Sequence, residues 1–212
     1  VRLNTGQIYS FEALLRWHHP KLGTVPPGQF IPHAERTGLI RGIGRWVLEH
    51  ACAQGAQWLA KGLDFGILAV NISPPQFRDD GFISSVRSAL EESGFPPERL
   101  ELEITENLLV RDTEELIDKM HELRALGIRF AIDDFGTGYS SLSYLQKMPV
   151  DRLKLDQSFM QRIDHEENNR IIAGAVIALG EAMKIDVIAE GIEHQEQETA
   201  LRELGCPEGQ GY

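Results

Sequence analysis

Residues 129–134 read RFAIDD, an apolar run that ends in two adjacent carboxylates. Such a run is typical of a buried strand whose last residues reach the edge of a sheet. Two other runs repeat the pattern, since 66–71 reads GILAVN and 186–190 reads DVIAE. An ionisable or amide side chain therefore stands at the carboxyl end of each of these predicted strands.

Strand-like runs alternate with helix-like runs along the whole chain. We predict strands over 8–17, 66–71, 100–104, 129–133, 152–155, 186–190 and 209–212, and helices over 30–61, 81–93, 113–126, 169–184 and 195–204. The strand starts recur about every 30 residues, which is the spacing of repeated βα units. No proline- or serine-rich linker interrupts this rhythm, so we predict one domain over 1–212.

This alternation favours either a doubly wound sheet or a (β/α)8 barrel. No glycine-rich phosphate loop follows an early strand, which disfavours the dinucleotide-binding form of the first. Polar residues gather at the carboxyl ends of the predicted strands, where barrel enzymes build their active sites, and this favours the barrel. The residues at or near these ends are Asn71, Glu101, Glu103, Thr105, Asp133, Asp134, Lys154 and Glu190. The earliest strand adds Glu12 in its middle.

The same residues predict a metal site. A single carboxylate at a strand end is most often a helix N-cap or a solvated loop residue. Several carboxylates that point into one space repel each other, and divalent cations remove that repulsion. Carboxylates with one amide oxygen are hard ligands that suit Mg²⁺ or Mn²⁺ rather than zinc. The adjacent His18 and His19 would point to opposite faces of a strand and are not expected to chelate a metal.

Composition and charge restrict the class of protein further. Among 212 residues, 42% are hydrophobic and 25% are charged, as in globular domains, and no apolar run approaches the ~18 residues of a membrane span. The net charge of −11 disfavours polymeric nucleic acid and anionic lipid as partners. Cys52 and Cys206 fit no zinc or disulfide pattern and predict reduced thiols in a cytosolic protein. The start, VRLNTGQIYS, is no signal peptide, and we expect a piece of a longer polypeptide.

Seven short motifs follow each other in register. They are FEALLRW at 11–17, NIS at 71–73, EITE at 103–106, DDFGTGYSS at 133–141, KLD at 154–156, AEGIE at 189–193 and GQGY at 209–212. Together they resemble the EAL-domain family of bacterial cyclic di-GMP phosphodiesterases. The resemblance implies a (β/α)8 TIM-like barrel with an irregular antiparallel first strand. Against the family pattern, the start of the first strand and the final helix are missing.

The resemblance also implies an activity, which is metal-dependent hydrolysis of cyclic di-GMP to linear pGpG. It implies two divalent cations, Mg²⁺ or Mn²⁺, with Ca²⁺ inhibitory. The metal ligands implied are Glu12, Asn71, Glu103, Asp133, Asp134 and Glu190, with Asp133 bridging. Lys154 is implied to orient the attacking water, and Glu190 to act as its general base. The other implied positions are Leu15, Arg16 and Gln210 at the substrate and Glu106 as the anchor of the loop 135–141.

Several alternatives stay open at this point. Lys154 could be a structural ion pair inside the carboxylate cluster, and Arg16 a surface arginine after a strand. The whole domain could be a catalytically silent cyclic di-GMP receptor, although such receptors typically lose metal ligands that are all present here. An unrelated barrel enzyme with a metal-stabilised enolate would not predict the loop at 133–141. The resemblance further implies a homodimer, sensor or GGDEF domains in the parent chain, and a cytoplasmic domain whose parent could be membrane-anchored.

Overall fold

The predicted strands form one sheet in a computed structural model, which describes residues 1–106, 108, 113–137 and 142–211. The strand order is β1-β4-β5-β6-β7-β8-β9, and each neighbouring pair is parallel. Order in the chain and order in space therefore coincide, as expected when successive strands are joined by crossovers over one face. The strands are β1 (Ser10–Ala13), β4 (Ile67–Ile72), β5 (Leu100–Thr105), β6 (Arg129–Phe135), β7 (Arg152–Leu155), β8 (Asp186–Ile192) and β9 (Glu208–Gly211).

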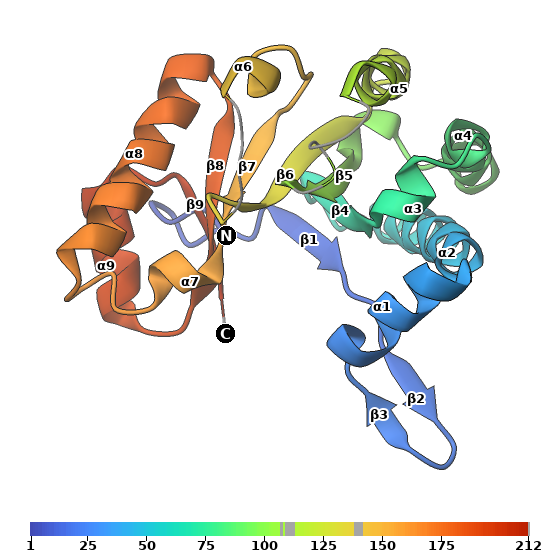
Figure 1. Ribbon diagram of the computed structural model, residues 1–212, viewed down its shortest axis with the longest axis horizontal. Coiled ribbons are helices and arrows are strands. Elements are labelled where there is room, and N and C mark those ends of the chain that lie inside the picture. The colour runs from blue at the N-terminus through green and yellow to red at the C-terminus, as the bar shows by residue number, and fades with distance from the viewer. Residues whose placement is uncertain (107, 109–112, 138–141, 212) are drawn as a thin grey trace.

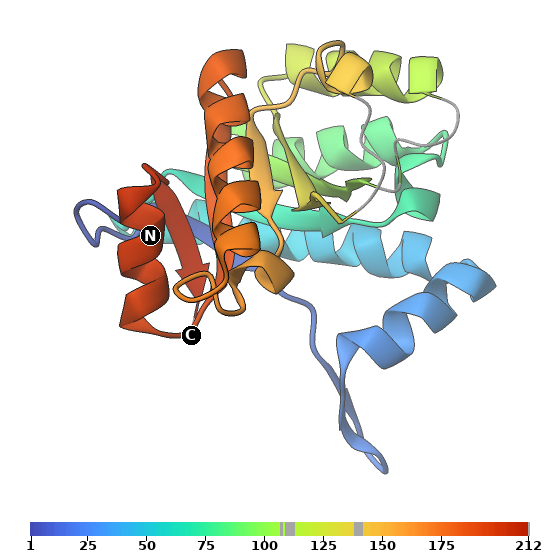
Figure 2. The ribbon, with the colours of Figure 1, turned by 60° about the vertical axis from the view of Figure 1, so that its left-hand side comes forward.

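Helices cover the outer side of the curved sheet (Figures 1 and 2). The longer ones are α2 (Ile40–Ala60), α4 (Phe82–Ser93), α5 (Thr113–Ala125), α8 (Glu167–Met183) and α9 (Gln195–Glu203). The shorter ones are α1 (Pro27–Thr37), α3 (Pro74–Phe77), the 3₁₀ turn η1 (Pro97–Arg99), α6 (Leu142–Leu145) and α7 (Gln157–Met160). On α5 the predicted apolar face is confirmed, because Leu116, Met120 and Leu123 are buried.

The sheet curves as in a barrel but stays open in the part of the chain that the structure describes. β1 and β9 stand at the two ends of the strand order, and no described ladder joins them. Their side chains still meet, since Gln210 Nε2 on β9 donates a hydrogen bond of 2.7 Å to Glu12 Oε2 on β1. The predicted α/β barrel-type fold is therefore confirmed in the form of a seven-stranded partial barrel.

Antiparallel pairing occurs in two places among the described residues. Arg2 and Glu208 form an isolated antiparallel bridge, and β2 (Trp17–His19) pairs with β3 (Gly23–Val25) in a separate hairpin. The strand that carries Glu12 is not antiparallel, because β1 runs parallel to β4. The strand predicted over 8–17 was also too long, because the chain leaves the sheet after β1 and enters β2. The antiparallel start is thus found beside β1 rather than in it.

The helix predicted over 30–61 is two helices, α1 and α2. Gly38 separates them: its φ is 75°, and its N–H donates to the carbonyl of Glu35 over 3.2 Å. This left-handed glycine is a common helix C-cap, and apolar residues spaced evenly on both sides of it conceal the break from a periodicity search. The break allows α1 and the β2–β3 hairpin to extend away from the sheet (Figure 1).

Gly180 on α8 is a position where the packing of helix on sheet has no spare room. A Cβ built there would lie 2.3 Å from Val187 Cγ2 and 2.8 Å from the Ile185 carbonyl oxygen. Because backbone cannot move aside cheaply, we expect Gly180→Ala to lower the free energy of unfolding by about 1–3 kcal/mol. Denaturant titration measures this change.

Gly174 on the same helix is the matched control. A Cβ there would meet Leu204 Cδ2 at 3.5 Å, an ordinary contact. Gly174→Ala should therefore leave stability unchanged or raise it by up to about 1 kcal/mol, because alanine favours helix over glycine. Equal losses in both variants would contradict the packing argument.

Candidate active site

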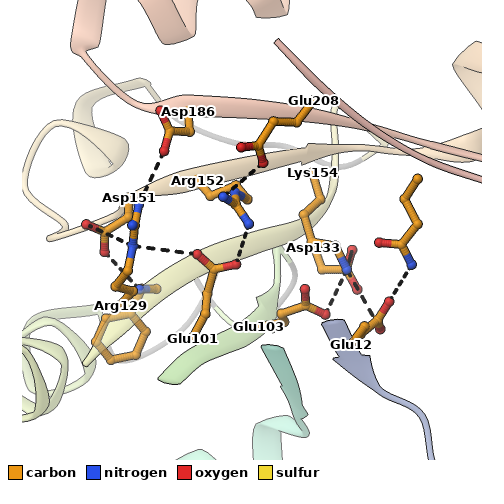
Figure 3. Close-up of polar contacts among 12 residues, drawn as sticks. Glu12, Glu101, Glu103, Arg129, Asp133, Asp151, Arg152, Lys154, Asp186 and Glu208 are labelled. Atoms are coloured by element: carbon orange, nitrogen blue, oxygen red, sulfur yellow. Dashed lines mark hydrogen bonds and ion pairs between the residues drawn. The ribbon is translucent and has the colours of Figure 1, made fainter. Parts of the chain in front are cut away.

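Side chains two residues apart on β5, β7 and β9 point into the interior of the partial barrel, in two layers (Figure 3). Alternate residues of a strand share a face, and the side chains of alternate strands fill one layer of a barrel. The layer nearer the amino ends of the strands holds Glu101, Arg152 and Glu208. The layer nearer the carboxyl ends holds Glu103, Lys154 and Gln210.

The layer nearer the amino ends is an ion-pair network. The Arg152 side chain is 2% exposed, and its guanidinium lies 3.0 Å from Glu101 Oε1 and 3.0 Å from Glu208 Oε2. Arg129 Nε adds a contact of 3.9 Å to Glu101. Buried charges persist only when they are paired, and here each one is. Glu101, which we predicted among the polar residues of the strands, therefore belongs to the ion-pair layer nearer the amino ends and not to the candidate site.

The layer nearer the carboxyl ends centres on Lys154, whose side chain is 3% exposed. Its Nζ lies 2.7 Å from Glu103 Oε2, 2.8 Å from Glu190 Oε1 and 3.3 Å from Asp133 Oδ1. Glu12 is next, with Oε1 at 3.9 Å. The predicted residues of four different strands thus meet around one ammonium group.

Glu12 is fixed by two amide side chains. Asn71 Nδ2 donates to Glu12 Oε1 over 2.6 Å, and Gln210 Nε2 donates to the other oxygen. Asn71 reaches Glu12 because β4 and β1 are neighbours, and Asn71 also stands opposite Glu103 on β5. Gln210, predicted at the substrate, is placed by the structure against a predicted metal ligand.

Asp133 and Asp134 separate at an irregularity of β6. The ladder between β6 and β7 shifts register between Ile132 and Phe135, and Asp134 has a φ of 55°. A non-glycine residue in this region costs of the order of 1 kcal/mol and is commonest at functional sites. Asp133 therefore points to Lys154, while Asp134 is exposed and lies beside the carboxyl group of Asp156.

Burial dominates the electrostatics of the cluster. It raises the pKa of Glu103 well above the usual value and the pKa of Glu190 to about 7, in both cases against the pull of Lys154. Burial, with neighbouring Asp133, raises the pKa of Asp134 to about 6. Burial alone would lower the pKa of Lys154, but the carboxylates, Glu103 first, raise it above the usual value. Burial thus favours the neutral forms of these carboxyl groups, while the lysine is held protonated.

A groove of about 500 Å³ opens beside the cluster. Its lining includes Glu12, Asn71 and Thr105 together with Leu15 and Arg16. Arg16 is exposed, and its Nη1 donates to the carbonyl of Leu15 over 3.0 Å. The groove therefore joins the predicted substrate residues Leu15 and Arg16 to the carboxylates.

Glu106 lies where the loop after β6 begins. Its Oε2 accepts a hydrogen bond of 3.1 Å from the backbone N–H of Gly136, whose φ is 97°. The loop residues 138–141, like Tyr212 of the last motif, lie outside the described residues. Glu106 thus contacts the backbone two residues after Asp134, and its role as an anchor of the loop stays a prediction.

We expect Glu106→Gln to lower the catalytic rate of the domain by about tenfold, and to lower the melting temperature by no more than a few degrees. The amide keeps the shape but weakens a charge-assisted acceptor, which is worth roughly 1.5–3 kcal/mol. Kinetics and calorimetry on the same preparation measure the two effects. If activity and melting temperature fell in proportion, Glu106 would have only a structural role.

Some of the site was missed from the sequence. The sequence predicts no role for Arg152 or Glu208, and it predicts none for Asp156 beyond its place in the KLD motif. The signal was present, because Arg152 precedes Lys154 by two residues and Glu208 precedes Gln210 by two, as Glu101 precedes Glu103. This shared spacing of two residues places both layers on the inner face of the sheet.

The residues fit divalent cations by their chemistry. Glu12, Glu103, Asp133 and Glu190 supply carboxylate oxygens, and Asn71 supplies an amide oxygen, which is the hard ligand set that Mg²⁺ and Mn²⁺ prefer. Among the described residues, no three His, Cys, Asp or Glu side chains already stand in a metal-binding arrangement. The carboxylates instead face the ammonium group of Lys154.

Fold and site together define an α/β barrel-type domain with a polar cluster at the carboxyl ends of its strands. The sequence model described as "EAL domain" matches residues 1–212, and the chain belongs to this family. The family resemblance seen in the seven motifs is thereby confirmed.

Two relatives from Pseudomonas aeruginosa illustrate the family. The bifunctional diguanylate cyclase/cyclic di-GMP phosphodiesterase MucR is 44% identical over 98% of this chain and 30% of its own length. A protein named as a cyclic di-GMP phosphodiesterase is 41% identical over 100% of this chain and 36% of its own. The chain thus spans about a third of each of these relatives.

Solved structures give the same result. A MucR phosphodiesterase in complex with c-di-GMP is 43% identical and superposes with a TM-score of 0.95, over 100% of this chain and 85% of that one. BlrP1 of Klebsiella pneumoniae, in a manganese and c-di-GMP complex, is 27% identical and superposes with a TM-score of 0.85, over 100% of this chain and 52% of that one. In the described part of the chain, the helices are too short or too polar to span a bilayer.

Proposed function

We propose that this domain hydrolyses one phosphodiester bond of cyclic di-GMP and releases linear pGpG. The observation that carries the proposal is the gathering of Glu12, Glu103, Asp133 and Glu190 around Lys154, beside a groove that reaches Arg16. The named activity of the relatives and the c-di-GMP complex of a close structural neighbour support the choice of substrate.

We propose two metal positions in the cluster. Glu12, Asn71, Glu103 and Asp133 would hold one cation, and Asp133, Asp134 and Glu190 the other. When bound, Mg²⁺ or Mn²⁺ would supply positive charge beside the phosphate and make a water molecule more acidic. The manganese complex of BlrP1 supports a divalent cation in this family.

The protein's own residues would carry the remaining work. Lys154 orients the attacking water, and Glu190 accepts its proton. The water oxygen bonds to phosphorus as the bond from phosphorus to the 3′ oxygen breaks, and a proton ends on that oxygen. Arg16 offers a planar fork of donors to a phosphate, and the groove beside Leu15 accepts the base and ribose.

Incubation with cyclic di-GMP, followed by chromatography of the products, tests the proposal. We expect pGpG with Mg²⁺ or Mn²⁺ and none with Ca²⁺, because Ca²⁺ is larger and takes more ligands in looser geometry. Tight binding of cyclic di-GMP without product in any metal would favour the silent receptor. Neither binding nor turnover would refute both functions.

We also propose that the domain acts in the cytoplasm as a homodimer within a longer signalling protein that carries sensor or GGDEF domains. The chain covers only about a third of the length of these two relatives, and this supports a longer protein. Light scattering on the purified domain tests the dimer.

A further inference from the structure

Lys154 lies at the centre of the carboxylates that the proposed function assigns to metal. Its Nζ lies within 3.3 Å of carboxylate oxygens of Glu103 on β5 and Asp133 on β6, and within 3.9 Å of one of Glu12 on β1; Figure 3 shows these three side chains around it. Glu190 on β8 adds a carboxylate oxygen at 2.8 Å. The side chain is 3% exposed, so little water replaces these contacts. Four carboxylates thus share one internal cation.

In this group the acidic side chains outnumber the cations. The four carboxylates carry four negative charges when ionised, and Lys154 offsets one of them. The cations of the neighbouring layer do not help much, because Arg152 is already paired with Glu101 and Glu208. Lys154 is therefore the only lysine or arginine among the described residues that is ion-paired to these four carboxylates.

We propose that Lys154 is the resident counter-ion of the metal-free site. Its ammonium holds the carboxylates together before metal binds, and the same charge lowers the affinity of the cluster for divalent cations. This inference rests on the metal site of the proposed function, but it does not depend on the hydrolysis of any substrate. It adds to the water-orienting role, which applies when metal and substrate are bound.

Both effects follow from one interaction. Like charges packed in a buried cluster repel, and a cation among them relieves that repulsion. A divalent cation that enters the cluster meets the ammonium at close range, where charge repulsion in a partly desolvated site is strong. Removal of the ammonium should therefore destabilise the empty protein and tighten metal binding at the same time.

The test compares the wild-type chain with Lys154→Met, which keeps the length of the side chain and removes its charge. Calorimetric titration with MnCl₂ gives the dissociation constant, and differential scanning calorimetry gives the melting temperature with and without Mn²⁺. We expect Lys154→Met to bind Mn²⁺ roughly tenfold more tightly or better. The metal-free variant should melt lower than wild type, and Mn²⁺ should raise its melting temperature by more than it raises that of wild type.

Arg152→Met is the matched control, because it removes another buried cation of β7, two residues earlier, that contacts none of the four carboxylates. We expect it to melt lower without any gain in Mn²⁺ affinity. Lys154→Arg retains the charge and should bind Mn²⁺ no more tightly than wild type. If Lys154→Met does not fold, Lys154→Gln, which can still hydrogen-bond the carboxylates, replaces it in the comparison.

The outcomes distinguish a failure of the counter-ion role of Lys154 from a failure of the proposed metal site. Equal or weaker Mn²⁺ binding by Lys154→Met, with wild type binding normally, overturns the counter-ion role. A gain in affinity for Arg152→Met as large as for Lys154→Met also overturns it, because the effect would then be general to buried charge. Absence of Mn²⁺ binding in wild type and variant alike refutes the metal site itself.

Discussion

Replacement of Asp133 by asparagine should reduce hydrolysis of cyclic di-GMP by about 10³-fold or more. Asp133 is the proposed ligand of both cations, and a metal contributes several kcal/mol to the stabilisation of charge in the transition state. The amide keeps the size of the side chain and removes the charge that faces Lys154 at 3.3 Å. Steady-state turnover with saturating Mg²⁺ or Mn²⁺ measures the loss.

Asp64→Asn makes the same chemical change at a distance from the cluster. Asp64 precedes β4, so it lies at the amino ends of the strands, and its side chain is 90% exposed beside Arg99. Its variant should keep near-normal turnover and stability, because exposed ion pairs contribute little. Near-normal activity of Asp133→Asn would refute the assignment of Asp133 as the bridging ligand.

The main strands could be predicted because each carries a local apolar run. The strand over 152–155 was predicted with the bounds of β7, and those over 66–71 and 100–104 differ from β4 and β5 by single residues. Residues 8–17 resisted prediction because a β-favouring composition does not say which residues find a partner, and only Ser10–Ala13 pair with β4. Gly38 shows the same limit for helices, since only its left-handed backbone ends α1.

The members of the site could be predicted better than their contacts. Polar residues at strand ends identified Asn71, Glu103, Asp133 and Glu190, because parallel strands place their carboxyl ends at one edge. Glu12, in the middle of the strand predicted over 8–17, was placed in the site by the family resemblance. The sequence does not say which side chains meet across the interior, since those contacts depend on the curvature of the sheet. Arg152 on β7 gives an example, because its ion pairs reach past the neighbouring strands β6 and β8 to Glu101 on β5 and Glu208 on β9.

Lys154→Ala and Arg16→Ala should affect different kinetic constants. Lys154 acts on the nucleophile, so its loss should lower kcat by on the order of a hundredfold, since its interaction matters when the nucleophile forms. Arg16, exposed at the groove, should contribute equally in ground and transition states, so its loss should mainly weaken binding. One charged hydrogen bond corresponds to roughly 1.5–3 kcal/mol, or on the order of tenfold to a hundredfold in affinity.

Steady-state kinetics, with cyclic di-GMP affinity measured separately in Ca²⁺ to prevent turnover, distinguish the two variants. Arg87→Ala, on the exposed surface of α4, is the control for loss of an arginine and should change neither constant. Among the described residues, the Arg16 side chain donates only to the carbonyl of its neighbour Leu15, so its variant should also melt as wild type does. If Lys154→Ala lost affinity while it kept its kcat, the water-orienting role would be wrong, and Lys154 would act only as an ion pair within the carboxylate cluster.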